Sequence, residues 1–390
     1  MKLIVIGLGQ CGGRIADEFA RLNSRAKSQR GIEIVIGTYA VNTDIADLSG
    51  LRRIKPDYEH RILIGGRKTG GHGVGKINEL GAEVAKEDAD KVIDAIRNTK
   101  RLAEADAFLL CAGSAGGTGS GSIPIMTQHI KERFIDKPVY NLTVLPFEHE
   151  TQTEERTIYN AATSLKSCYL VADAVFLVDN QRYISKDSSL LNNLAKINAL
   201  IVEPFYNILC AGEEKKSKYI GAKVLDAGDI IQTLVGWTIV GHSSSSLSFF
   251  KSLFKRTHDF RKKVNENQKG VQAMDEAVSS LSMQGSLLDA RRALYLVSAP
   301  SKQMNVDMIT ELGMHLKTIA PDCIIRSGDY PRDEGTIDVS LILSEFSDVP
   351  RIREYFSQAI NLITALQKRQ DGSEFGSAFD GSLKDIPSLL

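Results

Sequence analysis

Cysteine is scarce in this sequence, and its spacing excludes two common uses. Only five cysteines occur among 390 residues, namely Cys11, Cys111, Cys168, Cys210 and Cys323. Their number is odd and no two form a Cys-x-x-Cys pair, which argues against a disulfide framework and against a zinc site. We expect them to be reduced side chains of the protein core.

Long apolar runs and an excess charge are also missing. No segment approaches the roughly 18 consecutive apolar residues that a membrane span requires. The apolar start, Met1–Gly7, is too short for a signal peptide and leads directly into a glycine turn. Lys+Arg and Asp+Glu number 48 each, so no overall field attracts nucleic acid or an anionic membrane. We therefore expect a cytoplasmic protein with no direct membrane span and no nucleic-acid partner.

Several catalytic patterns are absent as well. The sequence has no Gly-Lys-Ser/Thr ending of a P-loop, no histidine pair at metal-ligand spacing and no Ser/His/Asp arrangement that its spacing singles out. A Walker-type site and protein metal ligands are therefore not expected.

What the sequence does contain is an alternation of short β-branched runs with longer stretches of helical period over its first 180 residues. This pattern predicts an α/β fold, a Rossmann-like parallel sheet covered by helices. The expected strands are Lys2–Gly7, Glu33–Val41, Arg61–Ile64, Ala107–Ala112, Val139–Leu145 and Ala174–Val178. Each is followed by a loop rich in Gly, Asn, Asp or Thr, and such loops gather at the ligand-binding edge of a doubly wound sheet.

The chain length suggests two domains. A helical stretch with apolar residues three and four apart, Ser188–Cys210, connects them, and polar, helical residues 246–290 precede strands at Ala293–Val297, Cys323–Arg326 and Thr336–Leu343. We expect a first domain over 1–187, a central helix over 188–212, a second α+β domain over 213–366 and a flexible tail over 367–390.

Two glycine loops indicate a phosphate site. Gly7–Gly12 fits G-x-G-x-x-G directly after the first strand, and we expect the next helix at about Gly13 to Leu22. This loop alone fits a dinucleotide dehydrogenase about as well, or a turn that binds nothing. The second loop, Ala112–Gly121, has five glycines and three hydroxyl residues, and Pro124 after it fits a first helical turn.

With these loops the sequence resembles the tubulin/FtsZ superfamily. Gly116-Gly117-Thr118-Gly119-Ser120-Gly121 is similar to the family's glycine-rich loop, and Gly9-Gln10-Cys11-Gly12 to the first phosphate loop of tubulin. Four further motifs resemble the archaeal CetZ branch: Leu145-Pro146, Asn160-Ala161-Ala162, Ala211-Gly212-Glu213 and Gly328-Asp329-Tyr330-Pro331. The resemblance extends from Met1 to about residue 365.

The resemblance implies a guanine-nucleotide site and names its residues. Phosphate contacts are expected from Gly9, Gln10, Cys11, Gly12, Arg14, Asn42, Asp44, Gly71, Gly73, Gly113, Gly116, Gly117, Thr118, Gly119 and Ser120. Ribose contacts are expected from Glu154 and Arg156, and guanine contacts from Asn180 and Asn198, whose amides carry both a donor and an acceptor. The expected cofactors are GTP or GDP together with Mg²⁺. We expect phosphate oxygens and water to hold the ion, with Gln10 and Asp44 in contact with the metal-bound water.

Two carboxylates are candidate catalytic groups. Asp226 and Asp229 open a helix on the same exposed face, which on sequence alone is typical of a capping box. The resemblance implies instead that they enter the next subunit's site and polarise the water that attacks the γ-phosphate. It thus implies a GTPase that assembles head to tail with copies of itself and hydrolyses GTP on assembly, for cell division or cell shape.

Two other segments are possible interaction sites. Phe249–Arg256 is basic and aromatic, as in a membrane-surface helix, although a solvated helix near a lateral filament contact fits it better. Residues 383–390 resemble the short peptide by which FtsZ binds membrane-tether adaptors, and a frayed terminus is the other interpretation.

Two other functions remain open. An NAD-dependent oxidoreductase would use the first glycine loop, but it predicts an acidic residue at the end of the second strand, and Glu33 begins that strand instead. A non-polymerising relative would bind nucleotide without useful hydrolysis.

Overall fold

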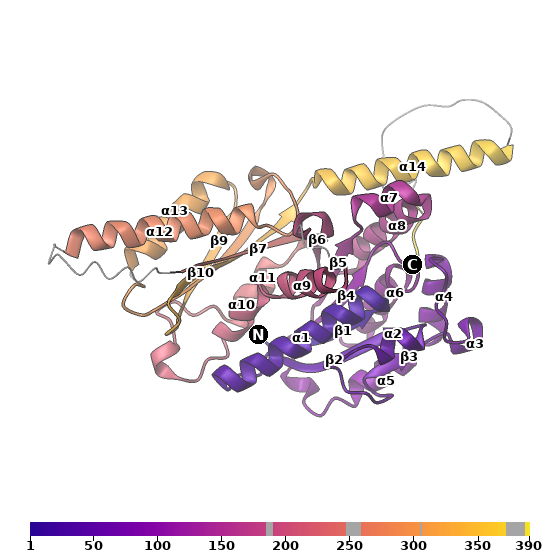
Figure 1. Ribbon diagram of the computed structural model, residues 1–390, viewed down its shortest axis with the longest axis horizontal. Helices are drawn as coiled ribbons and strands as arrows, with labels where there is room; N and C mark the ends of the chain where they lie inside the picture. Colours follow the sequence, from indigo (N-terminus) through magenta and orange to yellow (C-terminus); the bar gives the residue numbers. More distant parts are fainter. Residues whose placement is uncertain (185–189, 247–258, 305, 372–386) are drawn as a thin grey trace. The chain divides into compact units, whose positions relative to one another are not determined.

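The computed structural model describes residues 1–184, 190–246, 259–304, 306–371 and 387–390 (Figure 1). The chain forms two compact units, each built from separate stretches of sequence. The N-terminal unit contains Lys2–Asn23, Val35–Val202 and Asp348–Leu390, and the C-terminal unit contains Met1, Ser24–Ile34 and Glu203–Ser347. Each unit therefore differs from the consecutive segments 1–187 and 213–366 that the sequence predicts. The basic stretch Phe249–Arg256 and residues 383–386 lie outside the described residues.

The N-terminal unit is built on a parallel sheet in the order β3-β2-β1-β4-β5-β6. Its strands are β1 (Leu3–Leu8), β2 (Val35–Asn42), β3 (Arg61–Leu63), β4 (Ala107–Gly113), β5 (Val139–Leu145) and β6 (Ala174–Asp179). All six strands are confirmed, with ends shifted by at most two residues from the prediction. The carboxyl end of β1 pairs with those of β2 and β4, because Leu8 lies opposite Val41 and Ala112. The loops after these three strands therefore start side by side.

Helices cover this sheet. They are α1 (Gly9–Arg30, which continues into the C-terminal unit), α2 (Ile45–Ser49), α3 (Gly66–Thr69), α4 (Asn78–Glu87), α5 (Ala89–Arg97), α6 (Thr118–Arg133), α7 (Glu148–Thr153), α8 (Glu155–Val171), α9 (Leu190–Val202) and α14 (Pro350–Asp371). Two short 3₁₀ turns, η1 (Leu102–Glu104) and η2 (Asn180–Tyr183), complete the unit. Helix α6 packs between α4 and α8, and α8 packs against α14 (Figure 1).

Two predicted helix starts were wrong, and both errors concern the glycine loops. Helix α1 begins at Gly9 rather than Gly13, so the first glycine loop is itself the first helical turn. Helix α6 begins at Thr118, which places Pro124 in the helix interior rather than in its first turn. Glycine and proline both disfavour helix interiors, so propensity alone placed the starts too late. Packing against the sheet overrides that preference here.

The predicted central helix is two helices. Helix α9 ends at Val202 and α10 spans Phe205–Ala211, with Pro204 as the residue before it. Proline lacks the N–H that a continuous helix needs, which explains the break. The stretch Asn193–Ala211 is apolar and long enough to cross a membrane by composition, but 61% of it is buried inside the structure, as in the core helix of a globular protein.

The C-terminal unit is the predicted α+β unit. Its strands run in the order β7-β10-β8-β9, with β10 antiparallel to β7 and β8, and β9 parallel to β8. They are β7 (Gly236–Ser246), β8 (Arg292–Ala299), β9 (Ile324–Pro331) and β10 (Thr336–Phe346). Its helices are α10, α11 (Ala227–Thr233), α12 (Asp259–Ser279) and α13 (Val306–Ile319), with η3 (Ser217–Tyr219) and η4 (Leu287–Asp289). Helices α12 and α13 lie side by side (Figure 1). Strand β7 was not predicted from the sequence.

Candidate functional site

A cavity of about 430 Å³ lies in the N-terminal unit, beyond the carboxyl ends of the strands. Its wall comes from the loops after β1, β2, β4, β5 and β6, from the segment between α3 and α4 and from one face of α9. Predicted residues in the lining are Gly9, Gln10, Cys11, Arg14, Asn42, Asp44, Gly73, Gly113, Gly116, Gly117, Thr118, Gly119, Asn180 and Asn198. The structure thus brings together residues from six separate stretches of sequence.

The two glycine loops touch at the floor of this cavity. Gly9 has a φ of +68°, and a Cβ on it would lie 2.8 Å from the Gly119 nitrogen. A Cβ on Gly117 would lie 2.5 Å from Val74 Cγ2, so the loop between β3 and α4 approaches equally closely. Helices α1 and α6 both start here, and the first N–H groups of a helix have no intrahelical partner. Two helix N-termini with free donors and positive dipole ends therefore face the cavity, as an anion site requires.

The loops are also fastened to one another. The hydroxyls of Thr43 and Thr118 lie 2.6 Å apart, and the Gly73 N–H donates to the Thr43 carbonyl at 3.1 Å. Buried Asn160 donates its side-chain amide to three carbonyls, those of Lys76 (2.9 Å), Ala115 (3.0 Å) and Gly116 (3.1 Å). These bonds fix the donors of the site before any ligand arrives.

Carboxylates stand at one side of the glycine loops. Asp47 accepts hydrogen bonds from the Gln10 amide at 2.6 Å and from the Asn42 amide at 3.1 Å. Asp44 caps α2 by accepting from the Asp47 N–H at 3.0 Å. Within the described ranges, no group of three or more His, Cys, Asp and Glu side chains is arranged to hold a metal ion directly.

The other end of the cavity has amides and an apolar wall. Asn180 begins η2 directly after β6, and its side-chain oxygen is buried without a hydrogen-bond partner in the described part of the chain. On α9, Leu194 and Asn198 are four residues apart and so share one helix face. Phe147 completes this end, with its ring stacked on that of His149 at 5.6 Å between centroids.

Burial keeps one side chain of the phosphate end neutral. Desolvation raises the pKa of the Cys11 thiol to about 12, although Arg14 nearby lowers it. The thiol is therefore protonated at neutral pH and adds no negative charge to the wall.

Three predicted phosphate-contact residues lie outside the lining. Gly12 packs against the neighbouring strand, because a Cβ on it would lie 1.9 Å from the Cys111 carbonyl oxygen. The Gly71 carbonyl accepts from the Ile45 N–H at 3.0 Å, and the Ser120 hydroxyl donates to the Gly116 carbonyl. All three residues therefore contact other parts of the protein instead of the cavity.

The two predicted ribose residues also lie outside the lining. Glu154 pairs with Lys76, which does line the cavity, and Arg156 pairs with Glu79. The cavity is also lined by polar residues that were not predicted from the sequence, namely Lys76, Asp47, His149 and Glu150. Asp47 could have been found, since it lies three residues after Asp44 at the start of a short helix.

Asp226 and Asp229 belong to the C-terminal unit, where they form a capping box on α11. The Asp229 N–H donates to Asp226 Oδ1 at 2.9 Å, and the Asp226 N–H donates to Asp229 Oδ2 at 3.4 Å. Arg326 Nε lies 3.6 Å from Asp229 Oδ1, while Asp226 is exposed and makes no ion pair within 4.0 Å in the described part of the chain. The Asp226 carboxylate is therefore open to a second molecule.

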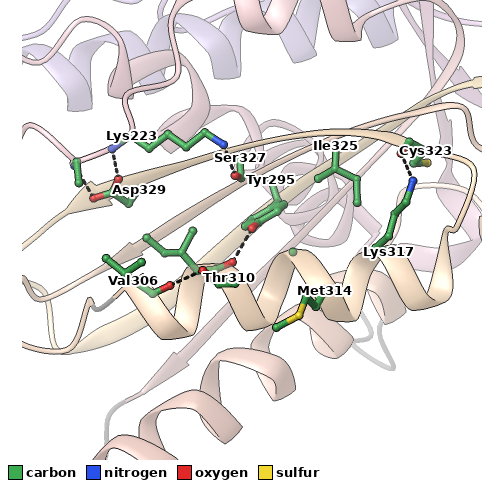
Figure 2. A pocket seen from close by; sticks show the side chains of 13 residues that line it. Lys223, Tyr295, Val306, Thr310, Met314, Lys317, Cys323, Ile325, Ser327 and Asp329 are labelled. Atoms are coloured by element: carbon green, nitrogen blue, oxygen red, sulfur yellow. Dashed lines mark hydrogen bonds between the residues drawn. The ribbon is translucent and has the colours of Figure 1, made fainter.

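The C-terminal unit has a groove of about 640 Å³ between α13 and strands β8 and β9 (Figure 2). Its lining includes Val306, Met314 and Ile325, and its polar groups already have partners. Lys317 donates to the Cys323 carbonyl at 2.9 Å, and Asp329 accepts from two backbone N–H groups. None of the predicted site residues lines this groove.

Comparison with known proteins places both units in one family. Residues 2–186 match the family model of the tubulin/FtsZ GTPase domain, and residues 187–361 match the C-terminal domain of tubulin-like CetZ proteins. Tubulin-like protein CetZ1 of Haloferax volcanii is 34% identical over 377 residues, which cover 92% of either chain.

Solved structures of CetZ proteins have the same fold as this chain. The GDP-bound monomer of H. volcanii CetZ1 superposes with a TM-score of 0.79 at 30% identity, over 93% of this chain and 100% of that one. A GTPγS-bound protofilament of H. volcanii CetZ2 gives 0.80 at 28% identity, over 94% of this chain and 100% of that one. The chain therefore belongs to the tubulin/FtsZ family, in its CetZ branch.

Proposed function

We propose that this protein is a cytoskeletal GTPase that binds guanine nucleotide in the cavity of the N-terminal unit and assembles head to tail with copies of itself. The observation that carries the proposal is that the starts of two helices line one cavity together with the Asn180 amide oxygen, which has no hydrogen-bond partner in the described part of the chain. A nucleotide has the matching polarity, with phosphate oxygens at one end and base N–H groups at the other.

The phosphate end binds anions through the backbone. The first turns of α1 and α6 supply N–H donors, and Thr118 adds a hydroxyl. Because Asn160 and the Thr43–Thr118 contact already hold these loops, little ordering cost remains when the ligand binds.

The base end favours guanine. Guanine presents N1–H and an amino group on one edge, and the Asn180 oxygen is an acceptor without a donor in the described structure. Asn198 offers a second amide, and Leu194 lines the cavity from the same side of α9, where it would pack against the face of a bound base. Adenine has an acceptor at N1 and no 2-amino group, so in the same position it would offer this buried oxygen no donor.

Mg²⁺ fits the site through water. Mg²⁺ keeps several waters and takes phosphate oxygens readily. Asp44 and Gln10 both line the cavity beside the glycine loops, so either side chain could accept from or donate to a metal-bound water. When bound, the ion neutralises charge on the phosphates.

Hydrolysis in this proposal depends on assembly. Phosphoryl transfer needs mainly positioning and charge neutralisation. Asp226 is an exposed carboxylate on a rigid helix start, able to orient a water for a neighbouring molecule's nucleotide. The protofilament of the relative CetZ2 supports self-association, and we propose that the filaments serve cell shape or division in the cytoplasm.

Nucleotide preference is the first test. Titration of the nucleotide-free chain with GDP, ADP and NAD⁺ should show tight binding of GDP alone. Asn180→Ala should lower the GDP-over-ADP preference about tenfold, the effect of one lost hydrogen bond of about 1.4 kcal/mol. Asn98→Ala, at the end of α5 and outside the cavity, is the matched control. Preference for NAD⁺ would contradict the proposal.

Assembly is the second test. Light scattering followed by electron microscopy should show filaments with GTP and their loss as GTP is consumed. A chain that binds GDP and GTP but never scatters light would be the non-polymerising alternative, and would overturn the assembly part of the proposal.

The C-terminal peptide 383–390 is proposed as the attachment point of a membrane-tether adaptor. In the described portion of it, the Leu389 N–H donates to the Ser167 hydroxyl on α8 at 3.1 Å. Deletion of residues 380–390 should leave assembly unchanged, and a loss of assembly would refute the adaptor role.

A further inference from the structure

A buried arginine of the C-terminal unit has one distant acidic partner. Arg30 is the last residue of α1, and its side chain is 4% exposed. Its one ion pair in the described part of the chain joins Nη2 to Glu334 Oε1 at 4.0 Å, which is too long for a hydrogen bond. Its Nε and Nη1 atoms are buried, and neither has a hydrogen-bond partner there. Because an uncompensated buried charge is costly, this guanidinium group indicates a site for an anion.

Aromatic rings hold the Arg30 guanidinium group in place. Its Cζ lies 4.1 Å from the centroid of the Tyr206 ring and 5.1 Å from that of the Tyr330 ring. Such cation–π contacts fix the group but supply no full negative charge. Burial raises the pKa of the neighbouring Cys210 thiol, although the charge of Arg30 lowers it, so the thiol is neutral at pH 7. The surroundings therefore position Arg30 without neutralising it.

A second buried arginine faces the same carboxylate. Arg332 follows β9, and its side chain is 8% exposed. Its Nε lies 3.6 Å from Glu334 Oε2 and is also without a hydrogen-bond partner in the described residues. Arg332 has a closer acidic partner as well, because its Nη1 donates to Glu214 Oε2 at 3.1 Å. When Glu334 is left out, the two guanidinium groups and Glu214 carry one net positive charge, which one carboxylate can balance.

The Glu334 carboxylate is held loosely between the two arginines. Each of its oxygens faces one guanidinium group, and both distances exceed that of a hydrogen bond. The side chain is 51% exposed, and ion pairs of such exposed groups contribute little to stability. The adjacent Asp333 fixes the backbone independently, since it accepts from the Tyr219 hydroxyl and pairs with Lys218 at 3.0 Å. Glu334 can therefore be displaced while the segment that carries it stays in place.

We propose that Arg30 and Arg332 bind a carboxylate group of another molecule, which replaces Glu334 between them. The incoming group accepts from the Arg332 Nε–H and from the Arg30 guanidinium group, and Glu334 moves into solvent. A phosphate dianion matches the single positive charge less well. The carboxylate comes from a small free acid or from an acidic side chain of a partner protein, since both present the same two oxygens. None of these residues lines the nucleotide cavity, so the inference does not depend on the proposed function.

The exchange makes Glu334 and Arg30 act in opposite directions. Loss of the Glu334 carboxylate removes the competitor for the two guanidinium groups and should strengthen binding of an added carboxylate. Loss of the Arg30 charge removes one of the two donors and should weaken it. A cluster with a structural role alone would bind no added carboxylate, with or without Glu334.

The test is a saturation-transfer difference NMR titration of the full chain with sodium acetate, at an ionic strength kept constant with sodium chloride. We expect Glu334→Ala to lower the dissociation constant of acetate about tenfold, and Arg30→Met added to that variant to raise it again about tenfold, the scale of one charge-assisted hydrogen bond. Asp322→Ala is the matched control. It also removes one negative charge from the partner of an arginine, but Asp322 and Arg291 are both exposed, so acetate binding should not change.

Arg30→Met should fold normally, because it removes a poorly compensated buried charge and keeps a long side chain beside the two rings. Its melting temperature should be no lower than that of the natural chain. The same titration with a capped tripeptide that contains one glutamate identifies the source of the carboxylate. Tighter binding than that of acetate indicates a partner's side chain, and binding no tighter indicates a small free acid. Acetate binding that Glu334→Ala does not tighten, or that Arg30→Met leaves unchanged, would overturn the inference.

Discussion

The hydroxyl groups of Thr43 and Thr118 lie 2.6 Å apart, both buried, and join the loop after β2 to the first residue of α6. Thr118 also lines the cavity, so its hydroxyl orientation depends on Thr43. Backbone spacing at the phosphate end is thus set by side chains 75 residues apart in sequence.

Thr43→Val should test this link. Valine keeps the volume but leaves the buried Thr118 hydroxyl without its partner, which costs about 1–3 kcal/mol. Urea unfolding of the nucleotide-free chain measures the loss. Thr43→Ser keeps the hydroxyl and is the control, so the link is refuted if valine proves no more destabilising than serine.

Asp226→Asn should remove turnover without unfolding the chain. Asparagine caps helices as well as aspartate does, so the free energy of unfolding should change by less than about 0.5 kcal/mol. GDP affinity should persist, steady-state GTP hydrolysis should fall more than about tenfold, and filaments should last longer. Asp322→Asn, another exposed aspartate of the same unit, is the control. Normal hydrolysis by Asp226→Asn would remove the proposed catalytic role.

The sequence predicted the sheet of the N-terminal unit because buried parallel strands are short continuous apolar runs, and Leu3–Leu8 and Ala107–Gly113 are such runs. The loops could be predicted for a related reason, since their glycines and hydroxyl residues follow those runs directly. Strand β7 was not predicted because its second half is a run of serines, which does not resemble a buried strand. Those serines find partners only in the fold, such as the Ala273 carbonyl for Ser243 and Asp338 for Ser244.

The cavity wall was only partly predictable. Glycines of a phosphate loop can be recognised in the sequence by their residue type. A lysine in a polar loop is common, and nothing in the sequence around Lys76 shows that the Asn160 side chain donates to its carbonyl. The same holds for Arg156, because nothing in the sequence indicates its ion pair with Glu79. Such choices between neighbours are settled by tertiary distances.

Gly121→Ala should be much more destabilising than Gly116→Ala. A Cβ on Gly121 would lie 2.0 Å from the Asn78 carbonyl oxygen, where α6 crosses α4, whereas a Cβ on Gly116 would meet nothing within 4 Å. Overpacking of this kind costs roughly 1–3 kcal/mol or more. Thermal unfolding of the two nucleotide-free variants gives the comparison. Similar melting temperatures would mean that the two helices separate easily at this contact.

Glu214→Gln should destabilise the C-terminal unit. The Glu214 carboxylate accepts from Arg332 at 3.1 Å and from the Tyr330 hydroxyl at 2.9 Å, and its side chain is 1% exposed. Neutralising Glu214 leaves the buried Arg332 charge with only the exposed Glu334 carboxylate, 3.6 Å from its Nε, at a cost of roughly 3 kcal/mol. Glu334→Gln is the control, because that side chain is 51% exposed and should cost less than about 1 kcal/mol. Equal effects in urea unfolding would contradict the assignment.

Asp179→Asn should stabilise the nucleotide-free protein, by an amount that depends on pH. Burial raises the pKa of Asp179, although the Gln181 N–H, which donates to it at 3.0 Å, and the charge of Arg351 both lower it. A raised pKa means that the folded state prefers the protonated acid more than the unfolded state does. The resulting stability is present below the unfolded pKa of about 3.9 and is lost as pH rises through the folded value.

Asparagine cannot ionise, yet it keeps an acceptor for the Gln181 N–H. The melting temperature of Asp179→Asn should therefore exceed that of the natural chain at neutral pH, and the difference should shrink as pH falls towards about 4. Asp94→Asn, whose side chain is 69% exposed on α5, controls for the loss of one negative charge. A gain for Asp179→Asn that stays constant from neutral to acid pH would show that burial of this carboxylate is not its cause.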